Sequence, residues 1–229
     1  MGEGFNHKRI WEIDFFRGIA LILMIIFHVV FDLKEFAHVS VNYVSGFYYY
    51  IGKSAGILFI LLAAISCHFS KSNTKRGLQI LGMGLVITLV SHLFNPSYGI
   101  KFGILHFLGT SIIIYPLFKD INKWLLLIFG TIIIILGNYF KLINMPFDYL
   151  FIFGLSSELF ISADYYPLLP WFGVFLYGIF ISKLLYREKK SLFSFLPRFN
   201  FVSYLGRHTF SIYLIHQPLI ILLIWLAIR

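Results

Sequence analysis

Long apolar segments separated by short polar ones make up most of this sequence. Seven segments are apolar over most of their length and are bounded by charged or turn-forming residues: 11–31, 46–69, 77–94, 102–118, 123–140, 166–186 and 204–228. A helix that crosses a bilayer needs about 20 mostly apolar residues. The pattern therefore predicts an all-α, polytopic transmembrane helical bundle with about seven spans.

One stretch between these segments, residues 145–165, is only half apolar. It contains Pro146, Asp148, Glu158 and Asp164. We expect a short interfacial or re-entrant helix here, which is tolerated only where protein or water surrounds it. Because neither an internal repeat nor a low-complexity linker divides the sequence, we expect one domain, 1–229.

The composition agrees with a membrane protein. Of the 229 residues, 59% are hydrophobic and only 13% are charged, whereas a soluble domain has about 25% charged residues. The same numbers exclude intrinsic disorder. Cys67 is the single cysteine, which excludes an intramolecular disulfide and cysteine-rich metal sites. We expect no metal.

The positive charges predict an orientation. The chain has 19 Lys and Arg against 10 Asp and Glu. If the N-terminus is cytoplasmic, the outer segments hold only Lys34, Lys53, Lys101, Lys141 and Arg229, and all other Lys and Arg lie inside. This is the asymmetry of the positive-inside rule. We expect the N-terminus in and the C-terminus out, in the plasma membrane, and the basic excess needs no nucleic-acid partner.

The first segment carries ionisable residues along one side. At 100° per residue, Asp14, Arg17, His28 and Asp32 fall within an arc of about 60°. Ionisable groups inside spans are costly and indicate function. Asp14 and Arg17 can neutralise each other at i,i+3. His28 and Asp32 are one turn apart, so the carboxylate could fix the imidazole tautomer of a general base.

Further polar residues fall near the two ends of the predicted spans. His106 belongs to the outer half with His28, and His216 lies in the last segment before Gln217-Pro218. Arg76 and Arg207 lie at the cytoplasmic starts of the third and seventh predicted spans. They either anchor the topology or form, together with Arg17, a basic inner mouth for a phosphate-bearing ligand.

A small-residue pattern lies near the outer end of the second segment. Gly52 and Gly56 are four residues apart, a spacing that allows helices to approach closely. Packing within the monomer is the favoured interpretation, and a homodimer face is the alternative.

Several short motifs, taken together, resemble the heparan-alpha-glucosaminide N-acetyltransferase-like family of membrane acyltransferases, in its small prokaryotic branch. They span nearly the whole chain: residues 12–20 (EIDFFRGIA), His28 with Asp32, residues 102–106 (FGILH), residues 170–172 (PWF), residues 205–208 (LGRH) and residues 215–218 (IHQP). The first helix repeats the Arg-x10-His spacing of integral membrane acyltransferases as Arg17 and His28.

The resemblance implies that an acetyl group passes from cytosolic acetyl-CoA to an acceptor at the outer side, such as an amino sugar or an envelope glycan. It also implies that a histidine in the outer half is central to transfer. We expect His28, Asp32 and His106 to be the catalytic residues, with His28 preferred because it has a carboxylate partner and lies on the polar side of the first helix. In the lysosomal relatives the catalytic histidine lies in the loop after this helix, where His38 stands here, so His28 and His38 both stay open. The donor is expected to contact these residues: Asp14, Arg17, Arg76, Arg207, His208, His216 and Gln217.

Two other functions are open to a chain with such residues. A non-enzymatic carrier or proton-coupled transporter would use the His, Asp and Arg side chains as a relay. A b-type cytochrome would use histidines as axial ligands, but the spacing within single helices gives no bis-histidine pattern, so no haem is expected.

Overall fold

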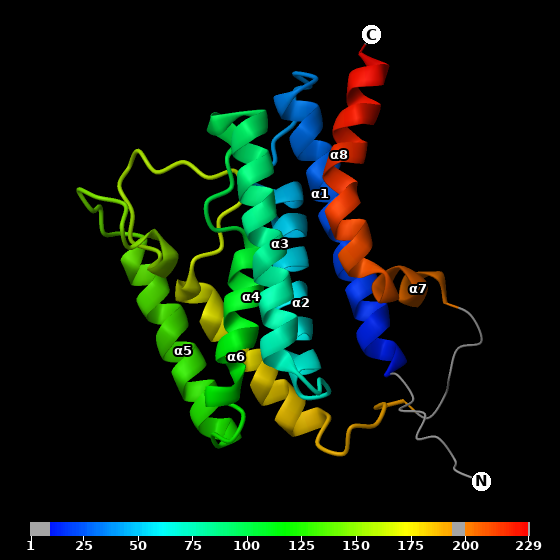
Figure 1. Cartoon of the computed structure of the whole chain (residues 1–229), viewed down its shortest axis with the longest axis vertical. Coiled ribbons are helices and arrows are strands. Elements are labelled where there is room, and N and C mark those ends of the chain that lie inside the picture. The colour runs from blue at the N-terminus through cyan, green and yellow to red at the C-terminus, as the bar shows by residue number, and fades with distance from the viewer. Residues whose placement is uncertain (1–9, 194–199, 229) are drawn as a thin grey trace. The chain divides into compact units, whose positions relative to one another are not determined.

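The computed structural model describes residues 10–193 and 200–228, and every regular element in these ranges is a helix (Figure 1). Six of these helices are long and apolar enough to cross a membrane: α1 (Trp11–Glu35), α2 (Phe47–Cys67), α3 (Asn73–Phe94), α5 (Lys123–Phe140), α6 (Leu168–Leu185) and α8 (Thr209–Ala227). A shorter apolar stretch, Ile104–Leu117, joins α4 (Ile104–Ile114) to the 3-10 turn η2 (Tyr115–Leu117). The predicted all-α membrane bundle of about seven spans is confirmed.

Three segments differ from expectation in ways that bear on the site. The helix α1 continues to Glu35, so Asp32 lies inside it. The segment 204–228 is two helices, α7 (Phe201–Arg207) and α8, because the backbone leaves helical geometry at His208. The stretch 145–165 holds a single 3-10 turn, η3 (Phe151–Phe153), instead of an α-helix.

The chain divides into two compact units. The first unit comprises Met1–Phe59 and Glu188–Arg229, and the second comprises Ile60–Arg187. The first therefore contains α1, most of α2, α7 and α8. The second contains the end of α2, then α3, the short turn η1 (Pro96–Tyr98), α4, α5 and α6.

In the first unit, α7 lies directly against the backbone of α1. A Cβ atom added to Gly206 would lie 1.7 Å from the carbonyl oxygen of Asp14, and one added to Gly18 would lie 2.0 Å from that of Val202. Only glycine permits this approach. On α2, Gly52 packs against the Phe27 ring of α1, so this member of the small-residue pattern serves packing within the chain, as predicted.

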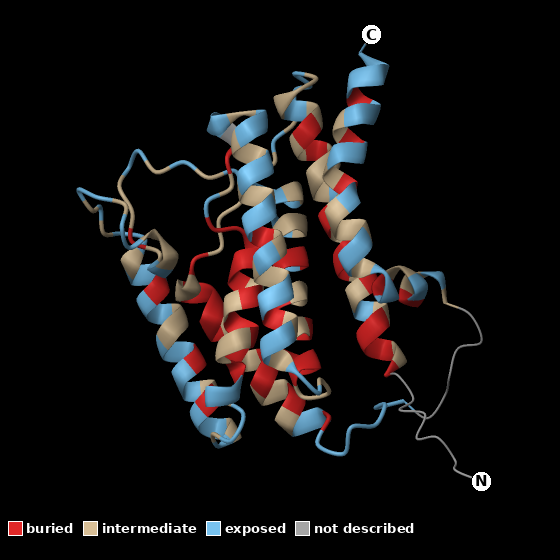
Figure 2. Ribbon diagram, in the orientation of Figure 1, coloured by how far each residue is buried: buried red, intermediate tan, exposed pale blue. Residues whose placement is uncertain are grey.

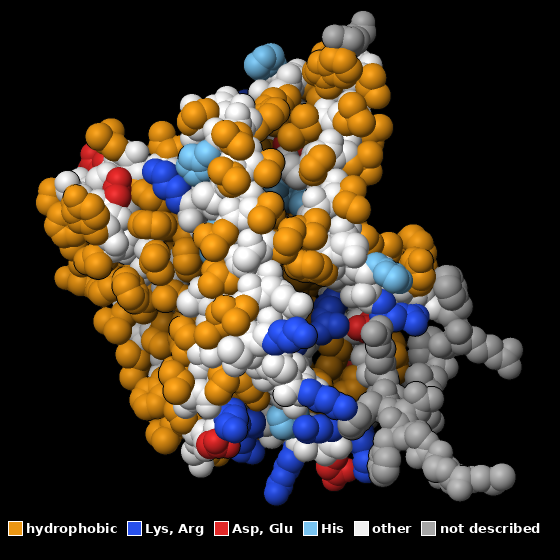
Figure 3. Space-filling model, viewed as in Figure 1, with side chains coloured by type: hydrophobic (Ala, Val, Ile, Leu, Met, Phe, Trp, Pro, Cys, Tyr) orange, Lys and Arg blue, Asp and Glu red, His pale blue; other side chains and the backbone are white. Residues whose placement is uncertain are grey.

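In the second unit, α3 packs on α4 and α5 packs on α6. Large side chains such as Phe107 and Phe175 are fully buried between them, as the red segments of α4 and α6 show in Figure 2. The outward sides of α3 and α5 are apolar and exposed, and hydrophobic side chains cover the α5 flank in Figure 3. In a chain that spans a membrane, such faces contact lipid.

Candidate active site

Four predicted site residues meet in the first unit and form what we call the polar cluster: His28 and Asp32 on α1, and His216 and Gln217 on α8. The two imidazole rings lie edge to face, with centroids 4.8 Å apart and planes at 66°. The Nε2 atom of Gln217 donates to both carboxylate oxygens of Asp32, at 2.8 and 3.0 Å. The sequence placed these residues on the first and last spans, and the packing of α8 on α1 brings them together.

The partner of Asp32 differs from the expected one. Asp32 is fully buried, and its hydrogen-bond partner is Gln217 rather than His28. Within the described residues no hydrogen bond joins His28 to Asp32. The reason is that α8 presents an amide donor at this level of α1. An ionised carboxylate only accepts hydrogen bonds, so the Gln217 nitrogen faces it and Oε1 points elsewhere.

Three polar atoms of the polar cluster are buried without a hydrogen-bond partner in the described part of the chain: His28 Nδ1, His216 Nε2 and Gln217 Oε1. Leaving one such atom unsatisfied costs about 1–3 kcal/mol, and native proteins rarely do so. Three of them in one place indicate a site built for a polar group.

The other predicted catalytic residue, His106, lies in the second unit at the start of α4. It is buried, its Nδ1 accepts the Gly103 N–H at 3.2 Å, and its Nε2 lies 3.0 Å from Thr88 Oγ1. Since Nδ1 accepts, the ring proton is on Nε2 and is donated to Thr88. Both nitrogens are thus engaged in holding the N-terminus of α4 against α3, and the catalytic role of His106 stays a prediction.

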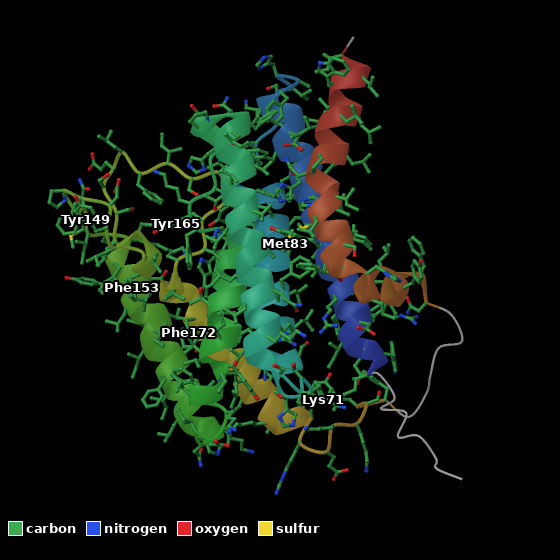
Figure 4. The ribbon with its side chains drawn as sticks, in the orientation of Figure 1. Lys71, Met83, Tyr149, Phe153, Tyr165 and Phe172 are labelled. Carbon is green, nitrogen blue, oxygen red and sulfur yellow. The ribbon has the colours of Figure 1, made fainter. Side chains whose placement is uncertain are left out.

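Sequence reasoning missed the role of Asp164 beside this helix end. Its Oδ2 accepts the Ile104 N–H at 2.8 Å, so it caps the first turn of α4, where a carboxylate is favourable. Burial raises the pKa of the Asp164 carboxyl to about 6, although the Ile104 hydrogen bond opposes this. Its neighbour Tyr165, labelled in Figure 4, pairs with Phe102 through an isolated bridge.

The predicted ion pair lies in the first turns of α1, in the first unit. Arg17 Nη1 lies 3.0 Å from Asp14 Oδ1, and Asp14 is buried. Nearby on α7, Arg207 is exposed and its Nε donates to the Ser203 carbonyl at 3.4 Å. His208 is exposed at the junction of α7 and α8. Of the described residues of the first unit, Arg17 and Arg207 are arginines, and Arg17 is paired with the Asp14 carboxylate.

Arg76 belongs to the second unit, where it binds the end of α2. Its guanidinium donates to the carbonyls of Ala63 and Ser66 at 3.3 Å and to Cys67 Sγ at 3.1 Å. These are carbonyls at a helix C-terminus, which a cation stabilises. The structure thus gives Arg76 a role in capping α2, and its contribution to an inner mouth stays a prediction.

A polar pocket of about 510 Å³ opens beside the same helix end. It is lined by Cys67, His68, Ser70, Lys71, Ser72, Asn73, Thr74, Tyr115, Pro116, Lys119 and Asp120. Lys71 lies at the opposite end of the second unit from Tyr165 (Figure 4). The pocket adds two lysines that sequence reasoning did not select, because surface lysines at an inner helix end are already explained by the positive-inside rule.

The alternative catalytic residue, His38, lies outside the polar cluster. It is exposed in the connection between α1 and α2, with a backbone φ of 54°.

Comparison with known proteins identifies the family. The family model described as heparan-alpha-glucosaminide N-acetyltransferase, catalytic, matches residues 9–218. No curated protein and no solved structure matches the chain. The match extends over both units and includes every residue of the polar cluster. The chain therefore belongs to this family of membrane acetyltransferases.

Proposed function

We propose that this protein moves an acetyl group from cytosolic acetyl-CoA to an acceptor at the outer side of the plasma membrane. The observation that carries the proposal is the polar cluster between two membrane-spanning helices, where three buried polar atoms have no partner among the residues that the structure describes. Acyl transfer needs a group that takes a proton or carries the acyl group, and histidine serves both roles. Because the family model covers both units, we treat them as one catalytic domain.

The donor is proposed to enter from the cytosolic side. Arg17 and Arg207 in the first unit are candidates to bind the phosphates of CoA. Taken by itself, the second unit offers Arg76 and the pocket that includes Lys71. Asp14 pairs with Arg17, and His208 directly follows Arg207. Arg17 and His28 are 11 residues apart on α1, about 16 Å along the helix axis. The long pantetheine arm would run along α1 and carry the thioester to His28, His216 and Gln217.

The acceptor is proposed to arrive from the outer side. An amino sugar, an envelope glycan or a small hydroxyl compound would each present an N–H or O–H group to the polar cluster. A histidine of the polar cluster is proposed to act as the base or as the acyl carrier, and His28 is the first candidate. Asp32, one turn after His28 on α1, is bound by Gln217.

The first experiment tests donor binding without knowledge of the acceptor. Acetyl-CoA should raise the melting temperature of the purified full-length protein, because a ligand that binds only the folded state stabilises it. Dephospho-CoA should give a smaller shift if the phosphates are recognised. Arg17→Ala should weaken acetyl-CoA binding by the loss of a charge-assisted contact, about 1.5–3 kcal/mol.

The second experiment measures transfer. Proteoliposomes loaded with acetyl-CoA should acetylate external glucosamine, and His28→Ala should abolish this transfer while retaining donor binding. Full transfer by His28→Ala, with transfer lost in His38→Ala, would move the chemistry to the loop. A protein that neither binds acetyl-CoA nor transfers acetyl would be left with the carrier function instead.

A further inference from the structure

We propose that His216 on α8 is a further catalytic residue: the base that removes the proton from the acceptor. This inference rests on the proposed function, and it names the group in the polar cluster that does this step.

The hydrogen bonding of His216 fixes its tautomer. Nδ1 lies 2.5 Å from the carbonyl oxygen of Tyr213, one turn earlier on α8. A carbonyl only accepts, so Nδ1 carries the proton of the neutral ring. The lone pair is therefore on Nε2, which is buried and has no hydrogen-bond partner in the described residues. A histidine oriented through one nitrogen and free at the other has the arrangement of a general base.

The setting of His216 holds this nitrogen in place. The residue is 8% exposed, and its ring packs edge to face on His28. The next residue, Gln217, binds Asp32 with two hydrogen bonds and so fixes α8 against α1. The adjacent Pro218 has no N–H and leaves the Leu214 carbonyl without its usual helical donor. Gln217 is accordingly a positioning residue, whereas His216 would contact the reacting atoms.

His28 has a less determined tautomer than His216. Its Nδ1 is buried without a partner, and no hydrogen bond of the described residues fixes which nitrogen carries the proton. A neutral His28 with the proton on Nδ1 can donate to the thioester carbonyl oxygen, where negative charge develops. The two rings would then have different parts in one reaction: His216 as the base and His28 as the donor to the oxygen.

The step balances without another reactant. The acceptor nitrogen or oxygen attacks the thioester carbon as its proton moves to His216 Nε2. The new bond to the acetyl group forms, the carbon–sulfur bond breaks, and CoA leaves as a thiolate. The His216 imidazolium then gives the same proton to the sulfur, which regenerates the neutral ring and releases CoA as a thiol.

Two variants test the assignment. His216→Asn keeps an amide that can donate to the Tyr213 carbonyl but has no base at the Nε2 position, and His216→Ala leaves room for free imidazole. Transfer from acetyl-CoA to glucosamine should fall by roughly 10²–10⁴-fold in both. Acetyl-CoA binding and the melting temperature should stay near those of the wild type. Ser211→Ala, on an exposed position of the same helix, should transfer as the wild type does.

Added imidazole separates a chemical role from a structural one. It should restore part of the transfer in His216→Ala but not in His216→Asn, where the side chain fills the space. Transfer within a few-fold of the wild type in both variants would overturn the inference while leaving the proposed function intact. Exchange of labelled CoA into acetyl-CoA without an acceptor, lost in His216→Ala, would also overturn it, because it would show an acyl carrier. A wild-type protein without any transfer or hydrolysis would contradict the proposed function as well.

Discussion

The contact of α7 with α1 decides whether an alanine at position 206 stabilises or destabilises the protein. Gly206 lies within α7, where helix propensity alone says that Gly206→Ala should stabilise the chain by about 1 kcal/mol. The structure says the opposite, because an alanine Cβ would lie 1.7 Å from the Asp14 carbonyl oxygen and 2.6 Å from its carbon. Real Cβ atoms essentially never come within 3.0 Å of another heavy atom.

The size of the effect follows from the atoms involved. Both obstructing atoms are backbone atoms of a buried helix turn, so no side chain can rotate away. To reach 3.0 Å from 1.7 Å, α7 must retreat from α1 by about 1.3 Å, and overpacking of this kind costs about 1–3 kcal/mol. In a chain of this size, each kcal/mol lowers the melting temperature by about 2–4 °C.

The assay compares Gly206→Ala with Gly82→Ala. Gly82 is a matched control because it also lies within a helix, but an added Cβ there would meet nothing within 4 Å. Thermal unfolding in detergent, followed by circular dichroism, should show a lower melting temperature for Gly206→Ala and an unchanged or higher one for Gly82→Ala. If both variants melt above the wild type, the close approach of α7 and α1 is wrong.

Three other outcomes are expected. For the topology, Ser72→Cys should be protected from an impermeant thiol reagent in intact cells and Asn144→Cys should react, while the reverse labelling would overturn the N-in orientation. Because the Arg76 guanidinium caps α2, Arg76→Ala should destabilise the protein by about 1–3 kcal/mol. A thiol-reactive dye should then label buried Cys67 at a lower temperature than in the wild type, and an unchanged labelling temperature would exclude the cap. The raised pKa of Asp164, about 6, means that the fold favours its neutral form, so stability is lost as the pH rises from about 4 through about 6. The melting temperature of Asp164→Asn should therefore rise relative to that of the wild type as the pH increases over this range. A difference in melting temperature between the two proteins that does not change with pH would contradict the raised pKa.

The contacts within the polar cluster were not available from sequence. The sequence places Asp32 one turn after His28 and favours a pair on one helix. In the tertiary structure Asp32 instead accepts hydrogen bonds from Gln217, which lies 185 residues away in the sequence. Helix periodicity says which side of α1 a residue occupies, but it does not say which other helix packs against that side. In the same way, Arg76 was expected at a ligand site, and its carbonyl partners on α2 became visible only in the fold.

The sequence by itself determined the class of the protein, because the length of each apolar segment and the distribution of positive charge are local properties, and they decide whether a segment inserts into a bilayer and in which orientation. It also determined the ionisable side of α1 and the ion pair of Asp14 and Arg17, which one helix turn brings together. Only the tertiary structure decided that α8 meets α1 at His28, that His216 is held by the Tyr213 carbonyl, and that the last segment breaks at His208. These features depend on contacts between distant segments and on which polar atoms such contacts leave unpaired, and no periodicity along the chain encodes either.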